Sequence, residues 1–326
     1  MSLFGNYEKT GAGIAKNAPK KKPFFRYWEL AFGKFWKIIE INMLMAAAFL
    51  PLLLAIVVIY YFIQDYTNTA MLIAAGFVIL FAVWFGPVIA GCTKILRNFS
   101  LEKPTFLMDE FFRTFRSCFR QACPMGIIDL VMAASVGSSS YVYPKIIAQL
   151  REQGSGGETF YYVLFILTLS IAIVVTLMSF YAYLMIVSTD LSMKNILKNS
   201  LALSFIALKK NFITLLITIL VMGGFGLLTF LFPYIMALFW IFIPTGFVAF
   251  MIVFNCYPVI QKYVINPYYA QRGETSPEQN FADNQGENLF EDMGGKETPV
   301  EAPASKSEKN QKEPSGKPKK KGKVIS

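Results

Sequence analysis

The stretch FYYVLFILTLSIAIVVTLMSFYAYLMI, residues 160–186, decides the fold class of this chain. It runs for 27 residues without a charged side chain. A helix rises about 1.5 Å per residue and the hydrocarbon core of a bilayer is about 30 Å thick, so this stretch can cross a membrane. A helix buried in a soluble protein is the alternative, but such helices are normally shorter and carry a polar stripe.

Five further windows of this kind lie along the chain. They are Ile41–Ile63, Met71–Thr93, Pro124–Val142, Phe212–Phe232 and Tyr234–Ile260. The six windows together hold 140 residues, of which only Asp129 is charged. The sequence therefore predicts an all-α, polytopic membrane protein with six transmembrane helices, the last two joined by a turn at Pro233.

The composition excludes most enzyme classes. The chain has no histidine, which excludes zinc sites built from His and Cys, Ser-His-Asp triads and Cys-His dyads. The sequence also lacks a phosphate-binding loop, a GxSxG motif, an HExxH motif and a dinucleotide-binding fingerprint. We therefore expect no enzymatic activity, no catalytic residue, no cofactor and no metal site.

The basic residues lie almost entirely on one side of the predicted spans. The N-terminal segment, the second and fourth connections and the C-terminal segment hold 29 of the 31 Lys and Arg residues. The first, third and fifth connections hold only Lys145 and Arg151. Because Lys and Arg are retained on the cytoplasmic side, we predict that both termini are cytoplasmic.

Three regions follow from this topology. Residues 1–23 form a basic cytoplasmic segment, residues 24–265 the six-helix membrane domain, and residues 266–326 a charged cytoplasmic tail. The tail is acidic first and ends in a cluster of lysines, with too few apolar residues to bury a core, which predicts disorder. A solvated tail is the simplest interpretation, and we expect no nucleic-acid partner.

The segments before spans one, three and five each predict an amphipathic helix. In 24–37, 108–122 and 191–210, apolar residues recur at three- and four-residue steps while Lys and Arg fall elsewhere. Basic amphipathic helices of this kind lie in the membrane interface and contact anionic lipid headgroups. The alternative is a cytoplasmic collar that docks another protein.

The same segments suggest a threefold internal repeat. Phe24-Phe25-Arg26 and Phe111-Phe112-Arg113 are 87 residues apart, as are the quartets 44–47 and 131–134, and a third apolar-Met-small-small quartet at 221–224 lies 90 residues further on. The predicted unit is one amphipathic helix followed by two spans, used three times, and internal repeats are common in transporter folds. Chance similarity in a chain rich in Phe and Ala is the alternative.

Several ordered runs of residues resemble a known family. They are Phe24-Phe25-Arg26, Gly33–Lys37 and Asn42, then Gly86–Thr93, Leu96–Phe99 and Asp109–Phe112, and finally Ile196–Ser200, Tyr257-Pro258, Tyr263 and Pro267. Over about residues 20–270 the chain resembles the YesL family of bacterial integral membrane proteins, whose biochemical function is unassigned.

The resemblance implies a location and a role. YesL-like proteins are typically encoded beside carbohydrate-uptake ABC transporters and two-component regulators. It therefore implies the bacterial cytoplasmic membrane and an accessory or regulatory role in carbohydrate uptake, with sugar-transporter subunits or a membrane sensor kinase as partners. A small-solute transporter or channel in its own right is the alternative.

Asp129 is the first candidate residue, because an ionisable group within a span is a functional candidate. It lies five residues after Pro124, so we expect it near the cytoplasmic interface, paired with Arg120 or a headgroup amine. A proton or ion site is the alternative. In the proposed repeat it corresponds to Asn42, which predicts a polar contact between helices in both copies.

The other candidates are glycines, a proline and charged residues of the second connection. Gly86, Pro87 and Gly91 form the best hinge, although kinks from simple packing are the alternative. Gly223, Gly224 and Gly226 predict a close approach of two helices. Ser135 and its neighbours could line a polar crevice or bond to carbonyls one turn back. The remaining candidates are Arg97, Asn98, Asp109, Arg113, Arg116 and Arg120.

Overall fold

The computed structural model describes residues 22–61, 68–154 and 156–276, which are almost wholly helical and contain no strand. The all-α prediction is therefore confirmed for the described part of the chain. Residues 1–21 and 277–326 lie outside the described residues, and the predicted disorder of the tail stays a prediction. Helix continues through Ala270, five residues beyond the predicted domain boundary at 265.

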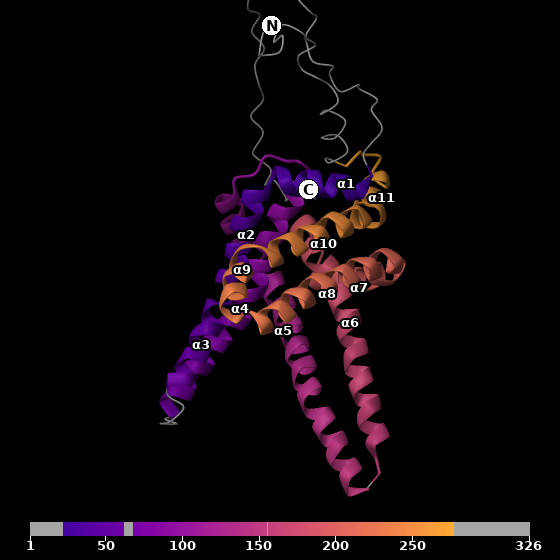
Figure 1. Ribbon diagram of the computed structural model, residues 1–326. Helices are drawn as coiled ribbons and strands as arrows, with labels where there is room; N and C mark the ends of the chain where they lie inside the picture. The colour runs from indigo at the N-terminus through magenta and orange to yellow at the C-terminus, as the bar shows by residue number, and fades with distance from the viewer. Residues whose placement is uncertain (1–21, 62–67, 155, 277–326) are drawn as a thin grey trace, which may run out of the picture.

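Three helical hairpins make up the body of the molecule (Figure 1). The first contains α2 (Phe35–Ala47), α3 (Leu50–Tyr61) and α4 (Asn68–Ser100), and the second contains α5 (Leu107–Gln153) and α6 (Glu158–Ser188). The third contains α8 (Leu208–Leu231), α9 (Pro233–Phe242) and α10 (Pro244–Ile260). The shorter elements are α1 (Pro23–Gly33), α7 (Met193–Ile206), the π-helix η1 (Gln261–Ile265) and α11 (Asn266–Ala270).

Length and apolar composition make this a polytopic membrane protein. Among the described residues, five helices are long and apolar enough to cross a bilayer, and α2 with α3 would make a sixth span bent by 42°. The bend falls just before Pro51, whereas α4 continues as one helix through Pro87.

The last predicted window, Tyr234–Ile260, is not a single helix. It is divided into α9 and α10 at Pro244, and the long apolar helical stretch instead runs from Pro244 to Ala270. Proline has no N–H and its ring clashes with the preceding turn, so it starts a helix more readily than it continues one. Pro244 accordingly occupies the first position of α10.

The predicted amphipathic helices take two different forms. The first and third are separate helices, α1 and α7, which end at breaks around Lys34 and Ala207. The prediction for 108–122 is wrong in one respect, because this segment continues without a break into the following span as part of the 47-residue α5. Pro124 lies inside α5 and does not end it, since membrane helices tolerate proline where neighbouring groups satisfy the freed carbonyl.

The core of the molecule lies at one end of the hairpins. We call this the basic end, since it carries Lys94, Arg97, Arg113 and Lys210. Here the C-terminal third of α4 is largely buried, and it contacts α2, α5, α6 and α10. The buried cluster includes Ile95, Leu96, Phe99, Tyr181 and Phe250.

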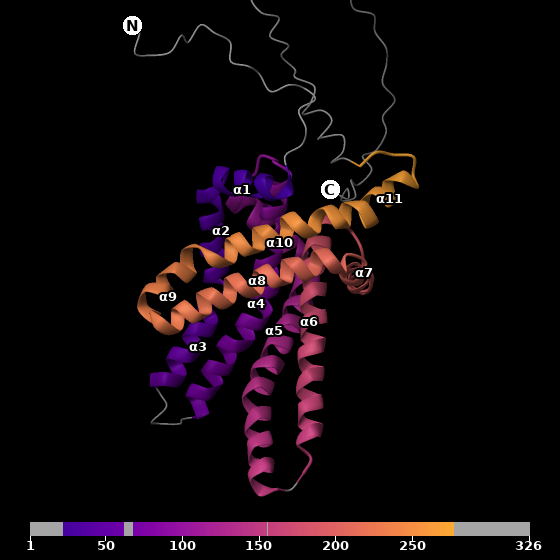
Figure 2. The same cartoon turned by 45° about the vertical axis from the view of Figure 1, so that its right-hand side comes forward.

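Away from the basic end the hairpins separate. Figures 1 and 2 show the α3–α4 and α5–α6 hairpins diverging, while the α8–α10 hairpin lies crosswise to both. The side chains on the diverging parts are apolar and exposed, as in Ile79 at 64%, Leu167 at 52% and Leu220 at 65%. Lipid tails are as apolar as these side chains, so a bilayer can cover this surface.

Candidate functional site

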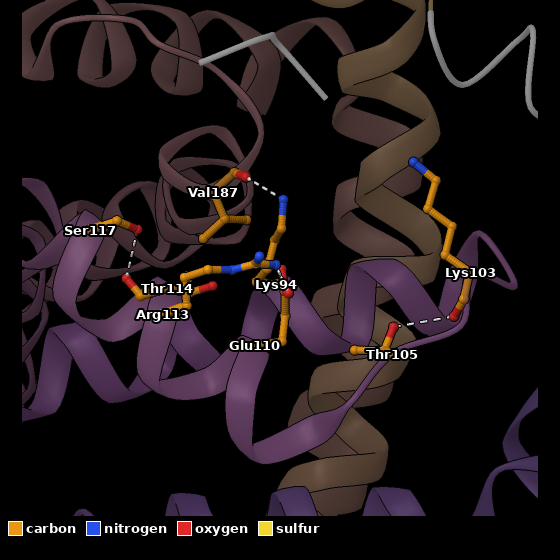
Figure 3. Close-up of polar contacts among 8 residues, drawn as sticks. All are labelled: Lys94, Lys103, Thr105, Glu110, Arg113, Thr114, Ser117 and Val187. Carbon is orange, nitrogen blue, oxygen red and sulfur yellow. Dashed lines mark hydrogen bonds and ion pairs between the residues drawn. The ribbon is translucent and has the colours of Figure 1, made fainter. Parts of the chain in front are cut away.

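A polar cavity of about 350 Å³ opens at the basic end, between α4, α5 and the link from α6 to α7 (Figure 3). The first turns of α5 supply much of its wall. Glu110, Arg113, Thr114, Ser117 and Cys118 follow one another at three- and four-residue steps, which places them on one face of a helix. Lys94 of α4 and residues 186–190 supply the rest.

Two side chains of the cavity hold the end of α6. Lys94 Nζ donates to the carbonyl oxygen of Val187 at 3.3 Å, and Cys118 Sγ donates to that of Ile186 at 3.7 Å (Figure 3 shows the first). The last turn of a helix leaves carbonyls without helical partners and carries a partial negative charge. The Lys94 ammonium therefore stabilises the C-terminus of α6 while it lines the cavity.

The charges that line the cavity balance one another. Glu110 is nearly buried and forms an ion pair with Arg113, and the lining contains one further cation, Lys94, and one further acid, Asp190. The thiol of Cys118 lies beside the hydroxyl of Ser117 and a carbonyl, and neither is a base that could activate a nucleophile. The arrangement can bind polar groups of a partner or ligand.

In the described ranges, Cys, Asp and Glu side chains form no group of three that could hold a metal ion.

Of the predicted candidates, only Arg113 reaches this cavity. Asp109, Arg113, Arg116 and Arg120 are all exposed, and their spacing places them on one stripe of α5. Glu110, next to Asp109 in sequence, turns inward instead, and the sequence analysis missed it together with Lys94. The inward orientation of Glu110 could have been predicted from its four-residue spacing to Thr114 and Cys118, which lie on the buried side of α5.

Arg97 and Asn98 do not line the cavity and make contacts within the fold instead. Arg97 is only 1% exposed, and its guanidinium lies over the ring of Tyr257 at 4.9 Å from the ring centre. Asn98 is half-buried, and its backbone carbonyl accepts a hydrogen bond from the N–H of Lys103 at 3.0 Å. Arg97 therefore belongs to the core between α4 and α10.

Asp129 pairs with α6 and not with Arg120 as predicted. One carboxylate oxygen accepts a hydrogen bond from Ser179 Oγ at 2.5 Å, and the other accepts one from Tyr183 Oη at 2.8 Å. The predicted pairing is wrong because the face of α5 that carries Asp129 is turned toward α6, whereas Arg120 is exposed. The predicted polar contact between helices is confirmed, with hydroxyl groups as its partners.

We expect Asp129→Asn to remain folded and largely functional. An asparagine keeps one acceptor oxygen, and its amide can donate to a hydroxyl that rotates to accept. Asp129→Leu should lose both bonds and lower the free energy of unfolding by about 1–2 kcal/mol, since hydrogen bonds within membranes average about 0.6 kcal/mol each. Unfolding of both variants in detergent measures the change in stability. An Asn variant that inserts normally into the membrane but loses all activity would contradict the prediction.

Asn42 satisfies the backbone at the break between α9 and α10. It is fully buried, and its amide nitrogen donates to the carbonyl oxygens of Trp240 at 3.0 Å and Ile241 at 2.7 Å. Its oxygen accepts from the N–H of Gly246 and the hydroxyl of Thr245. These backbone groups belong to the end of one helix and the start of the next, where helical partners are missing. Asn42 therefore caps both helices at once.

The predicted hinge at Gly86, Pro87 and Gly91 is a packing contact. A Cβ at Gly86 would lie 2.0 Å from the carbonyl oxygen of Ala122, and one at Gly126 would lie 2.5 Å from the nitrogen of Gly86. At Gly91 a Cβ would meet the ring of Phe111 at 2.8 Å. The buried backbones of α4 and α5 thus touch where these helices cross, and the packing alternative holds.

The prediction for Gly223, Gly224 and Gly226 is wrong within the described residues. A Cβ built at any of the three meets no atom within 4 Å. Gly223 and Gly226 are exposed and Gly224 is half-buried, and α8 lies crosswise to the other hairpins (Figure 2). The close approach occurs between Gly86 and Gly126 instead.

Asn211 is a second buried asparagine that the sequence analysis missed. It is 0% exposed, and its amide nitrogen donates to the carbonyls of Leu203 at 3.2 Å and Ser204 at 2.9 Å. Its oxygen accepts a hydrogen bond from Tyr181 Oη. Asn211 therefore caps the break between α7 and α8, as Asn42 does for α9 and α10. In the sequence it could have been recognised as the asparagine that directly follows Lys209-Lys210.

The chain was compared with known protein families, curated proteins and solved structures. Because none of the three comparisons finds a match, the resemblance to the YesL family stays a prediction from the sequence.

Proposed function

We propose that this protein is an accessory or regulatory partner of a carbohydrate uptake system of the ABC type in the bacterial cytoplasmic membrane. In this proposal it has six spans with the basic end and both termini in the cytoplasm, and each hairpin with its preceding basic segment is one unit of a threefold repeat. The proposal rests on the hydrogen bonds that hydroxyl groups of the long apolar helices form with carbonyls of their own helix.

Seven hydroxyl groups of these helices bond within the chain. The hydroxyls of seven residues each donate to a carbonyl one turn back in their own helix: Ser135, Thr168, Ser170, Thr176, Thr214, Thr218 and Thr229. For Ser135, a bond to the carbonyl one turn back was one predicted alternative, and a polar crevice was the other. A transport path needs polar groups that face the solute, so this bonding favours a helper protein over a transporter or channel.

The stripe of exposed arginines on α5 is the proposed contact surface. The side chain of Arg113 is 67% exposed, and Arg116 and Arg120 follow it on the same side of the helix. Arg presents a planar set of donors that binds carboxylates in two places at once. The stripe and the adjacent polar cavity would then bind an acidic cytoplasmic segment of a permease subunit or a membrane sensor kinase.

Crosslinking in intact membranes tests this proposal. We expect sugar-permease or sensor-kinase subunits to be recovered by mass spectrometry from cells grown on the inducing sugar. The Arg116→Glu/Arg120→Glu variant should reduce their recovery about tenfold, since two charge contacts are replaced by repulsion. Lys145→Glu is the control, because Lys145 lies near the opposite end of α5.

Two results would contradict the proposal. One is the absence of any transport or sensor subunit among the crosslinked proteins under inducing sugar. The other is solute-specific flux from liposomes that contain the purified protein alone, which would favour a transporter in its own right.

A further inference from the structure

A second cavity, of about 590 Å³, lies at the basic end below α1. It is bounded by α1, the segment after α4, the start of α8, the C-terminal half of α10 and the start of η1. Its polar wall comes from Arg26, Ser100, Lys210, Asn255, Tyr257 and Gln261. Leu101 and Phe254 contribute apolar surface to the same space.

The lining of this cavity is positively charged. Among the described residues that line it, Arg26 and Lys210 are the two cations and none is acidic, in contrast to the balanced first cavity. Arg26 also donates to Glu102 at 2.9 Å, but this pair is almost half exposed. A guanidinium has five N–H donors, so Arg26 can bind a further oxyanion beside Glu102.

The backbone and a buried cation add to this positive charge. Arg26 lies in the first turn of α1 and Lys210 in the first turn of α8, and helix N-termini carry partial positive charge and N–H groups without helical partners. The guanidinium of Arg97 lies over the ring of Tyr257, a lining residue, at 4.9 Å from the ring centre. The backbone therefore adds to the positive charge of both cations in the lining.

The position of α1 places the cavity at the level of the membrane interface. Tyr27 fixes α1 to α10, because its ring stacks on Phe250 at 5.5 Å and its hydroxyl donates to the carbonyl of Phe247 at 3.1 Å. Burial raises the pKa of Tyr27 to about 12, so the hydroxyl stays protonated at neutral pH. Phe24 and Phe25, beside Arg26, are 66% and 63% exposed, and exposed aromatic residues on a basic helix enter the headgroup region.

We propose that this cavity binds an anionic phosphate ester, with Lys210 and Arg26 contacting the phosphate oxygens and Phe254 and Leu101 contacting the apolar part of the ligand. A phospholipid headgroup and a soluble phosphate ester share this chemistry. Arginine and lysine are the usual partners of phosphate oxygens, and charge-assisted hydrogen bonds are the strong ones.

Thermal unfolding of the purified full-length protein in neutral detergent tests the site. The midpoint, followed by tryptophan fluorescence, is titrated with dioctanoyl phosphatidylglycerol, dioctanoyl phosphatidylcholine and glycerol phosphate. A ligand that binds only the folded protein raises the midpoint in a concentration-dependent way. We expect phosphatidylglycerol or glycerol phosphate to raise it, and phosphatidylcholine to have little effect because its headgroup has no net charge.

Lys210→Gln and Lys209→Gln form a matched pair for this experiment. Both remove one positive charge from the start of α8, but only Lys210 lines the cavity. Lys210→Gln should weaken binding about tenfold, the equivalent of one charge-assisted hydrogen bond, whereas Lys209→Gln should stay within about twofold of the unchanged protein. If Lys210→Gln does not fold, Arg26→Gln serves as the second variant with the same expectation.

The outcomes are distinct. Binding of the lipid without glycerol phosphate supports the proposal and assigns the site to a headgroup, and equal binding of both assigns it to a soluble phosphate ester. Stabilisation by neither compound would overturn the proposal. Equal weakening by Lys209→Gln and Lys210→Gln would also overturn it, because binding would then depend on overall charge rather than on the cavity.

Discussion

Replacement of Asn42 by alanine is expected to lower the free energy of unfolding by about 2–4 kcal/mol. The variant loses four hydrogen bonds, and hydrogen bonds within membranes average about 0.6 kcal/mol each, which gives the lower figure. The carbonyls of Trp240 and Ile241 and the N–H of Gly246 would also lose their partner at a buried helix break. An unsatisfied buried group contributes about 1–3 kcal/mol of destabilisation, so the upper figure allows for partial relaxation.

Unfolding in mixed detergent micelles, followed by tryptophan fluorescence, measures this effect. Asn42→Asp is the informative second variant, since it keeps the acceptor oxygen for Gly246 and Thr245 but cannot donate to the two carbonyls when ionised. Because an ionised carboxylate would be buried here with one oxygen against two carbonyl oxygens, Asn42→Asp should be at least as destabilising as alanine. Thr245→Ala removes only one of the four bonds and should be the mildest. An alanine variant as stable as the unchanged protein would show that α9 and α10 do not depend on this cap.

Gly86→Ala is expected to destabilise the protein by about 3 kcal/mol or more. The new methyl group would lie 2.0 Å from the oxygen and 2.8 Å from the carbon of the Ala122 carbonyl. Both are backbone atoms of α5 and cannot rotate away, so α4 and α5 must separate. Overpacking of a buried contact normally lowers stability by about 1–3 kcal/mol, and displacement of a whole helix places this substitution at the upper end. Gly126→Ala should act in the same way from the other side.

Gly223→Ala and Gly224→Ala are the matched controls for these substitutions. They make the same chemical change in an apolar helix, but the added methyl group meets nothing within 4 Å. Alanine is favoured over glycine in a helix by up to about 1 kcal/mol, so the controls should be neutral or slightly more stable. The same unfolding assay applies to all four variants. Equal effects at Gly86 and Gly223 would show that α4 and α5 do not cross in contact.

The long apolar helices could be predicted from the sequence because the signal is local. An uncharged run such as residues 160–186 needs no knowledge of its neighbours, and α6 spans it completely. The positions of the bends were harder to predict, because Pro51, Pro87 and Pro244 all lie within similar uncharged apolar windows. Only Pro87 lies within an unbroken helix, and its neighbour Gly86 touches α5 there.

The partners of the candidate residues could not be predicted in the same way. Asp129 and its partner Tyr183 are 54 residues apart, and their contact depends on how α5 is rotated about its own axis. Asp109 and Glu110 show the same difficulty at close range. They are adjacent and chemically alike, yet one is exposed and the other nearly buried against Arg113, because successive helical residues point about 100° apart. Assigning roles to them required the orientation of α5.

The bonds of Asn42 also constrain the time course of biosynthesis. Its partners lie 198–204 residues further along the chain, and at about 5–20 residues per second the ribosome needs about 10–40 s to supply them. During that interval α2 has already been synthesised, while α9 and α10 do not yet exist. The first two hairpins must therefore wait in an incomplete state, with this amide bonded to water, lipid or the insertion machinery, until the third hairpin arrives.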